Sequence, residues 1–301
     1  MRLESGRYIN ERSYIVIKSF YQEQPAISWN KADVKGCFLF YLSRRKDRLN
    51  TIIQLAKNDI RSRYANSLLG IVWAFVMPLV TILVFWYVFQ KGFRNLPIGD
   101  APYILWFSAA YIPWIFFVDV VTQGCNCLVE YSFLVKKIKF DVGRIPIIKV
   151  LSALFVHAFF VIFLLAMFLV YGYGLTPYAL QLMYYTFCVC ALGLGLTWLL
   201  AAVTVFFKDM NAIVNVLIQI GFWVTPILWN EDTMVDQSVR RVLSVNPMHY
   251  IVNGCRDSLI FHRWFWENPG ETVTFWVITL LIWVVGQVVF RRLSPFFADE
   301  V

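Results

Sequence analysis

The sequence predicts an all-α integral membrane protein with six transmembrane helices. Of its 301 residues 59% are hydrophobic and 15% are charged, whereas a soluble domain is roughly 45–50% apolar and about 25% charged. Six apolar stretches are each long enough to cross about 30 Å of hydrocarbon, which takes about 20 helical residues. They are Leu68–Phe89, Tyr103–Gly124, Ile147–Val170, Tyr178–Phe207, Ala212–Trp229 and Val273–Phe290. A large soluble protein would need charged faces on most of these helices, and such faces are absent.

Lysine and arginine predict the orientation. With the N-terminus inside, 21 of the 27 Lys and Arg residues fall on the cytoplasmic side and six fall outside. Because cytoplasmic segments carry the excess of these residues, both termini are expected in the cytoplasm. The net charge of +8 is therefore interpreted as an orientation signal rather than as nucleic-acid binding. The expected regions are a cytoplasmic segment 1–67 without a signal peptide, a membrane domain 68–290 and a cytoplasmic tail 291–301.

A basic amphipathic helix is expected just before the first span. Its apolar positions recur at helical spacing, and they are Leu42, Leu49, Ile52, Ile53, Ala56 and Ile60. Lysine and arginine decorate the rest of the helix, which suits it to lie on an anionic cytoplasmic leaflet. The alternative is an ordinary solvated basic face.

The cytoplasmic loop Asn126–Pro146 carries more apolar groups than a solvated loop needs. It combines apolar and basic side chains, which include Leu128, Tyr131, Phe133, Leu134, Lys136 and Lys137. This pattern predicts a short amphipathic element that docks onto a partner. On the outer side, Glu231–Glu271 forms a long segment whose Trp264, Phe265 and Trp266 are placed to sit at a membrane interface.

The chain lacks recognisable catalytic motifs. No Gly-x-x-x-x-Gly-Lys-Ser/Thr phosphate loop occurs, so ATP binding by the usual backbone cradle is not expected. Neither a catalytic triad nor a metal-ligand spacing is present, and no cofactor or metal is expected. His157, His249 and His262 are interpreted as isolated structural residues. The six cysteines do not form a disulfide pattern.

Polar groups inside the spans mark candidate substrate contacts. Asn211, Asn215 and Gln219 share one face of the fifth span with Phe222. Amides in lipid are costly unless they face protein or a wet cavity, so this face suits a route for a hydroxyl-rich substrate. Hydrogen bonding between helices is an equally good explanation.

Aromatic residues form a stripe on the second span. They are Tyr103, Phe107, Tyr111 and Trp114. Such a stripe serves either packing or stacking against sugar rings. Asp119, at the inner end of the same span, is expected to snorkel to the interface or to pair with a cation from another helix.

Several short strings occur in a characteristic order around these spans. They are Leu55–Tyr64, Ser67–Trp73 with Met77-Pro78, Phe206–Met210, Thr225–Trp229, Asn246–Tyr250, Arg256–Leu259 and Arg291–Asp299. Together they resemble the permease subunits of ABC transporters that export lipid-linked polysaccharides, namely O-antigen, teichoic acid and capsule. The resemblance covers about four fifths of the chain, from Leu55 to the C-terminus. One departure is that the basic–acidic pair before the first span appears as Lys57-Asn58-Asp59.

The resemblance implies a homodimer in the bacterial cytoplasmic (inner) membrane, bound to two copies of a separate ABC ATPase. It implies a coupling helix near Leu128–Asp141 and short re-entrant outer helices near Thr233–Phe261. The first and fifth spans would form the dimer seam and the channel. This places Trp73, Asn215, Gln219 and Phe222 along the path of an undecaprenyl-linked glycan, next to membrane lipids.

Arg61 and Arg63 lie at the expected inner mouth. Arginine binds phosphate through strong charge-assisted contacts, so both are candidates for the lipid phosphate. Ordinary positive-inside topology is the alternative explanation, and it accounts for both arginines slightly better than phosphate binding does. The alternatives for the whole chain are an ABC exporter of drugs or simple lipids, a membrane-embedded glycosyltransferase, and a non-transporting scaffold.

Overall fold

The computed structural model describes residues 50–65, 67–92, 101–136, 141–231 and 236–300. Positions Leu42 and Leu49 of the expected interfacial helix lie outside these ranges, and its remainder forms a helix over residues 50–63. Residues Ile52–Val301 belong to one unit of the chain. Every regular element in the described residues is helical, which confirms the predicted fold class.

Five helical segments are long and apolar enough to cross a membrane. They are Gly70–Gln90, Tyr103–Glu130, Val142–Val170, Pro177–Phe206 and Pro269–Glu300. Their central α-helices are α3 (Trp73–Trp86), α4 (Tyr103–Glu130), α6 (Ile145–Val170), α7 (Gln181–Phe206) and α12 (Pro269–Leu293). Each segment overlaps one of the predicted spans, because a run of about 20 apolar residues specifies a helix with its backbone groups paired internally.

The predicted fifth span is shorter than expected. The helix α8 covers Met210–Val224, whereas the apolar pattern extends the span to Trp229. It ends because Thr225 adopts an extended backbone with ψ of 132°. A residue before a proline avoids the helical conformation, and Pro226 follows. At 15 residues, α8 is about 22 Å long.

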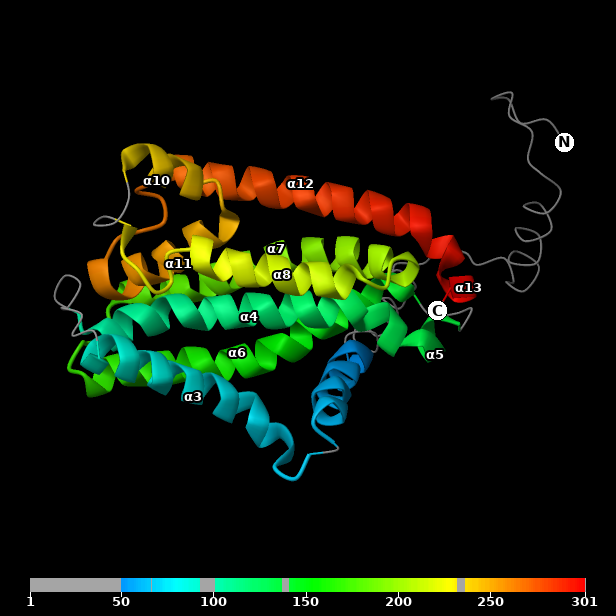
Figure 1. Cartoon of the computed structure of the whole chain (residues 1–301), viewed down its shortest axis with the longest axis horizontal. Coiled ribbons are helices and arrows are strands. Elements are labelled where there is room, and N and C mark those ends of the chain that lie inside the picture. Colours follow the sequence, from blue (N-terminus) through cyan, green and yellow to red (C-terminus); the bar gives the residue numbers. More distant parts are fainter. Residues whose placement is uncertain (1–49, 66, 93–100, 137–140, 232–235, 301) are drawn as a thin grey trace, which may run out of the picture. The chain divides into compact units, whose positions relative to one another are not determined.

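The two ends of the bundle carry different short elements. At one end lie the helix 50–63, α5 (Ser132–Val135) and α13 (Phe297–Glu300), and at the other lie α10 (Gln237–Leu243) and α11 (Pro247–Arg256) (Figure 1). We call these the α5 end and the α11 end. The shorter helix α8 also runs between the two ends, beside α4 (Figure 1).

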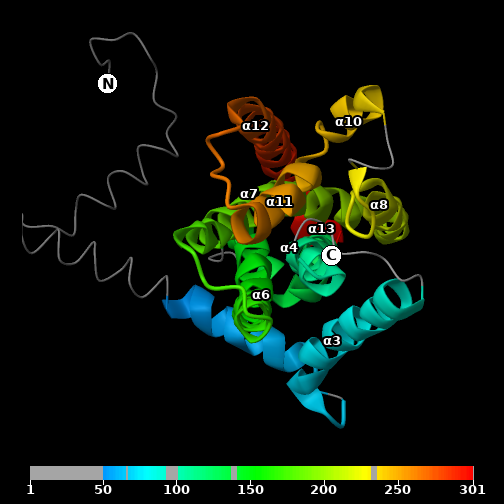
Figure 2. The same ribbon diagram turned by 90° about the vertical axis from the view of Figure 1, so that its left-hand side faces the viewer.

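The helix α4 is the centre of the bundle. It packs against α6, α7, α8 and α11, and the view from the α11 end shows it among these helices (Figure 2). In its most apolar window 72% of residues are buried, compared with 11% in the first span. The helices at the periphery of the bundle therefore expose apolar side chains to lipid or to other subunits.

The helices α7 and α12 approach each other closely through two glycines. A Cβ atom added to Gly286 would lie only 2.5 Å from the carbonyl oxygen of Gly195. Glycine at this crossing is therefore required, as in other membrane helix pairs packed through small residues.

The helix α4 continues to Glu130, beyond the predicted end at Gly124. Leu128 is consequently part of a long helix and not of a loop. Among the described residues of the predicted docking element after α4, only the single turn of α5 is helical. Short helices are present in the region where the resemblance implied them, as α10, α11 and the following π-helix Asp257–Phe261.

Candidate functional site

Five ionisable side chains form a charge cluster at the α5 end: Asp59, Arg63, Asp119, Glu130 and Lys149. The Lys149 ammonium lies 2.6 Å from Asp59 Oδ1 and also bonds to Glu130. Arg63 contacts Asp59 at 3.2 Å and Asp119 at 3.0 Å. The charge cluster thereby ties the helix 50–63 to α4 and α6.

Asp59 is the most enclosed acid of the charge cluster, with 4% of its side chain exposed. A buried carboxylate is costly unless it is paired. Burial by itself raises the pKa of Asp59, but the Lys149 charge and the hydrogen bonds from Lys149, Ser152 and Tyr131 together outweigh burial and hold that pKa below its usual 3.8. The Tyr131 hydroxyl also donates a hydrogen bond of 2.9 Å to Asp59. The basic partner that is displaced in the Lys57–Asp59 string is therefore supplied by α6.

Asp119 pairs with a cation from another helix, as one of the two sequence interpretations predicted. Its carboxylate receives both contacts from the same Arg63 nitrogen, at 3.0 and 3.2 Å. Arg63 is thus held between two carboxylates. Arg61 is exposed and makes no ion pair with any described residue. The two predicted phosphate ligands therefore occupy different electrostatic environments.

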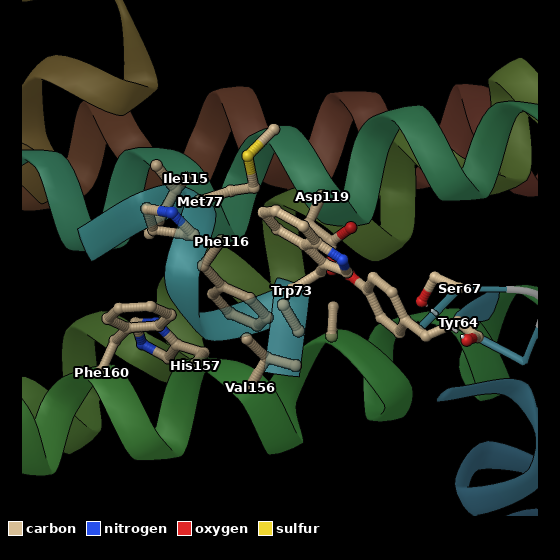
Figure 3. Close-up of a pocket in the computed structure, with 13 residues that line it drawn as sticks. Tyr64, Ser67, Trp73, Met77, Ile115, Phe116, Asp119, Val156, His157 and Phe160 are labelled. Atoms are coloured by element: carbon tan, nitrogen blue, oxygen red, sulfur yellow. Dashed lines mark hydrogen bonds between the residues drawn. The ribbon is translucent and has the colours of Figure 1, made fainter. Parts of the chain in front are cut away.

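A cavity of about 430 Å³ opens beside the charge cluster, between α3, α4 and α6. Figure 3 shows Tyr64 and Ser67 at one end of it and Phe160 and His157 at the other. Asp119 and Trp73 also line it. We call it the amphiphilic cavity, because Tyr64 and Ser67 make one end polar while apolar and aromatic side chains form most of its walls.

A second hollow, of about 410 Å³, lies on the other side of Asp119. It brings together four of the residues predicted for the substrate channel, Tyr111, Trp114, Gln219 and Phe222. The centroid of the Phe222 ring lies 5.9 Å from that of Trp114 and 6.5 Å from that of Tyr111. We call this the aromatic hollow. It exposes π faces together with a side-chain amide.

The other predicted channel residues lie elsewhere. Tyr103 and Phe107 are buried in the core, where their rings stack with centroids 6.1 Å apart. The Tyr103 hydroxyl donates to the Leu228 carbonyl at 3.0 Å. These two residues therefore pack the α11 end of the bundle. Trp73 lines the amphiphilic cavity, and Asn215 is exposed on α8 outside both hollows.

Asn211 makes a hydrogen bond between helices, which was the alternative explanation of the amide face. Its side-chain amide donates to Asn126 Oδ1 on α4. This bond holds the start of α8 against α4. The amide face is thus divided, with one residue bonding between helices and Gln219 facing the aromatic hollow.

The predicted docking residues also divide into two groups. Leu128 and Leu134 are buried in the core near Phe297, so their side chains are not at the surface. Phe133 is 57% exposed, and Lys136 is exposed beside it. Tyr131 is engaged with Asp59, and Lys137 lies outside the described residues. The exposed face of α5 is therefore made by Phe133 and Lys136.

Sequence reasoning missed two polar clusters. Lys149 was not singled out in the sequence, yet its side chain is only 2% exposed. His249 was interpreted as isolated, but its Nε2 lies 2.6 Å from Glu231, which also accepts a bond from Asn253 at 2.8 Å. The spacing of Asn253 four residues after His249 was the available signal. His157 is buried, and its ring centroid lies 4.2 Å from that of Phe116.

The five long apolar helices are those of a multi-pass membrane protein. Residues 50–260 match the ABC-2 type transporter family, and this match covers more than two thirds of the chain. The chain therefore belongs to the ABC-2 type transporter family, as the resemblance of its motifs indicated.

Three curated relatives are O-antigen export system permease proteins named RfbA. One from Myxococcus xanthus is 26% identical over 247 residues, which cover 81% of this chain and 93% of the relative. Two from Klebsiella pneumoniae are 22% and 21% identical, and each match covers 82% of this chain and 93% of the relative.

Proposed function

We propose that the chain is the permease half of an ABC exporter that moves an undecaprenyl-linked polysaccharide, of the O-antigen or teichoic-acid type, across the bacterial cytoplasmic membrane. The family match supports the transporter class, and the names of the three relatives support a polysaccharide substrate. A separate ATPase supplies the energy, with both termini of this chain on the same, cytoplasmic side.

The aromatic hollow is the observation that carries the choice of substrate. Tyr111, Trp114 and Phe222 offer apolar ring faces, and Gln219 offers both a donor and an acceptor. Sugar rings present apolar C–H faces and polar edges, which match this combination. An exporter of drugs or simple lipids has no need for the amide.

The amphiphilic cavity suits the lipid carrier of such a substrate. Its walls include Trp73, Phe116 and Phe160, which provide an apolar surface for a polyprenyl chain. Arg61, which is exposed and lies three residues before Tyr64 of the cavity lining, is the better candidate for the phosphate, because the charge of Arg63 is already balanced by two carboxylates. We assign Arg63 to positioning Asp119.

The ATPase would dock on the exposed face of α5, at Phe133 and Lys136. The second copy of the chain would pack along α8, in which Val214 is the only buried residue in the single chain. Asn215 would then face the seam between the two copies, where a buried amide can bond to its symmetry mate.

Complementation tests the substrate. The chain and its ATPase are expressed in a strain lacking its own O-antigen permease, and surface polysaccharide is measured by gel and immunoblot. The wild type should restore the polysaccharide, and Phe222→Ala with Gln219→Ala should lower it at least severalfold. Phe155→Ala is the matched control, since Phe155 is 47% exposed on α6 outside both hollows.

Two results would contradict the proposal. The first is a lack of surface polysaccharide despite normal insertion of the chain. The second is an equal amount of surface polysaccharide in the strain with Phe222→Ala and Gln219→Ala and in the strain with the control Phe155→Ala. Mass spectrometry of the chain purified in mild detergent tests the partner: a phosphate-loop ATPase at one-to-one supports the energy source, and its absence from a dimeric preparation would exclude it.

A further inference from the structure

A third cavity, of about 280 Å³, lies at the α11 end. Unlike the aromatic hollow and the amphiphilic cavity, it is lined mainly by charged and amide side chains. Its acids are Glu231, Asp257 and Glu271, and its bases are Arg240, Arg256 and Arg263. We call it the outer polar pocket.

The floor of the outer polar pocket is rigid. The Arg256 guanidinium lies 3.3 Å above the Trp106 ring and is 3% exposed. It donates to the carbonyl oxygens of Pro226 at 2.7 Å and Ile227 at 3.0 Å. A charge held by stacking and by backbone carbonyls cannot move toward a ligand. Arg256 therefore shapes the pocket and holds the segment that follows α8 in place.

One wall is equally fixed. Glu231 accepts bonds from His249 at 2.6 Å and from Asn253 at 2.8 Å. Asn253 Oδ1 in turn accepts a bond from Arg256 at 3.3 Å. This wall presents a pre-organised row of polar atoms.

The opposite wall is open. Within the described residues, the side chains of Asp257, Arg263 and Glu271 make no hydrogen bond or ion pair, although all three line the pocket. Arg263 lies 5.9 Å from the Phe261 ring, which is itself 41% exposed. Two acceptors, one donor and an apolar ring face are therefore available to a ligand.

We propose that the outer polar pocket binds a neutral sugar residue of the exported chain, with Asp257, Glu271 and Arg263 as its ligands. Each sugar hydroxyl both donates and accepts, so recognition needs acceptors and donors together. The three acids and three bases cancel, which favours neither an anion nor a cation. This inference rests on the proposed function and adds an outer contact for the glycan beyond the aromatic hollow.

The test is saturation-transfer difference NMR of the full chain in lipid nanodiscs. The probes are neutral tetrasaccharides of mannose, rhamnose and N-acetylglucosamine, with a hyaluronan tetrasaccharide as the acidic comparison. The wild type should transfer magnetisation to at least one neutral probe. The double variant Asp257→Asn with Glu271→Gln should bind that probe about tenfold more weakly, since charge-assisted hydrogen bonds exceed neutral ones.

Glu267→Gln is the matched control. It removes one negative charge from the same segment, but Glu267 does not line the pocket. It should bind as the wild type does. Transfer to the hyaluronan probe alone, no transfer to any neutral probe, or equal transfer in the double variant would each overturn the proposal.

The complementation strain separates this inference from the proposed function. If the wild type restores surface polysaccharide while the double variant binds the neutral probe unchanged, the pocket assignment fails and the export function stands. If the wild type restores nothing, the export function fails, whatever the NMR result.

Discussion

The two ends of the bundle handle buried charge in opposite ways. At the α5 end, the acids and bases of the charge cluster satisfy one another across three helices. At the α11 end, the buried base Arg256 is satisfied by backbone carbonyls and a tryptophan ring, and the acids Asp257 and Glu271 are left facing a cavity. Charges that pair with each other hold helices together, whereas charges released from pairing remain available to a ligand.

The largest expected effect breaks the pairing at the α5 end. Lys149→Met leaves Asp59 as a buried carboxylate whose remaining cation, Arg63, is shared with Asp119. Breaking a buried pair costs about 3–5 kcal/mol, so the thermal midpoint in detergent should fall well below that of the wild type. Fluorescence-detected size-exclusion chromatography after heating measures this loss.

The double variant Asp59→Asn with Lys149→Met should recover part of that stability, because neither charge is then left alone. Lys208→Met, at an exposed position, is the control and should leave the midpoint unchanged. A single Lys149→Met variant as stable as this control would show that the charge cluster does not hold the helices.

A smaller loss is expected from the α11 end. Arg256→Met leaves three carbonyl oxygens without their donor, those of Trp106, Pro226 and Ile227. The same change also removes an unpaired buried charge, which offsets part of the loss, so we expect about 2 kcal/mol. The midpoint of Arg263→Met, at the exposed rim, should stay near that of the wild type. A loss as large as that of Lys149→Met would remove the contrast between the two ends.

A third change leaves stability alone and tests the exposed face of α5. Phe133→Ala removes a ring that is 57% exposed, so the folded chain should lose little. If α5 is the ATPase contact, an aromatic anchor there contributes about 2 kcal/mol of binding, roughly a thirtyfold loss of affinity. The measurement is the ratio of co-purified ATPase to chain. An unchanged ratio would move the contact away from α5.

The smallest effect concerns pH. Burial raises the pKa of Asp257 to about 6, partly opposed by Arg263, with Glu271 and Glu267 adding repulsion and Arg256 opposing it. The folded state therefore binds this proton more tightly than the unfolded state, whose pKa is near 3.8. Asp257 should add stability as the pH falls through about 6, and that gain is lost again as the pH rises.

Asp257→Asn should abolish this part of the pH dependence, measured as the thermal midpoint between about pH 7 and about pH 5. Asp59 behaves in the opposite sense, because its pKa lies below 3.8 and it stays ionised over that range. A wild type and an Asp257→Asn variant with identical pH profiles would contradict the assignment. Mild acid should therefore change the stability contributed by the α11 end and leave that of the α5 end unchanged.

Local sequence patterns specified most of the fold. Runs of about 20 apolar residues determine membrane helices wherever they occur, because unpaired backbone groups are excluded from hydrocarbon. The positions at which helices end were harder to predict from the sequence. Thr225 and Pro226 end α8 early, whereas α4 continues through Leu128. Both boundaries depend on one or two residues inside an otherwise uniform apolar pattern.

The sequence by itself determined the class of protein, the helical passes and the presence of polar residues within them. Only the tertiary structure decided which of those residues meet. Lys149 reaches Asp59 across 90 positions of sequence, and the outer polar pocket joins Trp106 to Glu271. Hydropathy and helical period report the solvent along one helix, whereas ion pairs and cavities depend on the packing angles between helices. For this reason the aromatic hollow was partly predicted and the outer polar pocket was not.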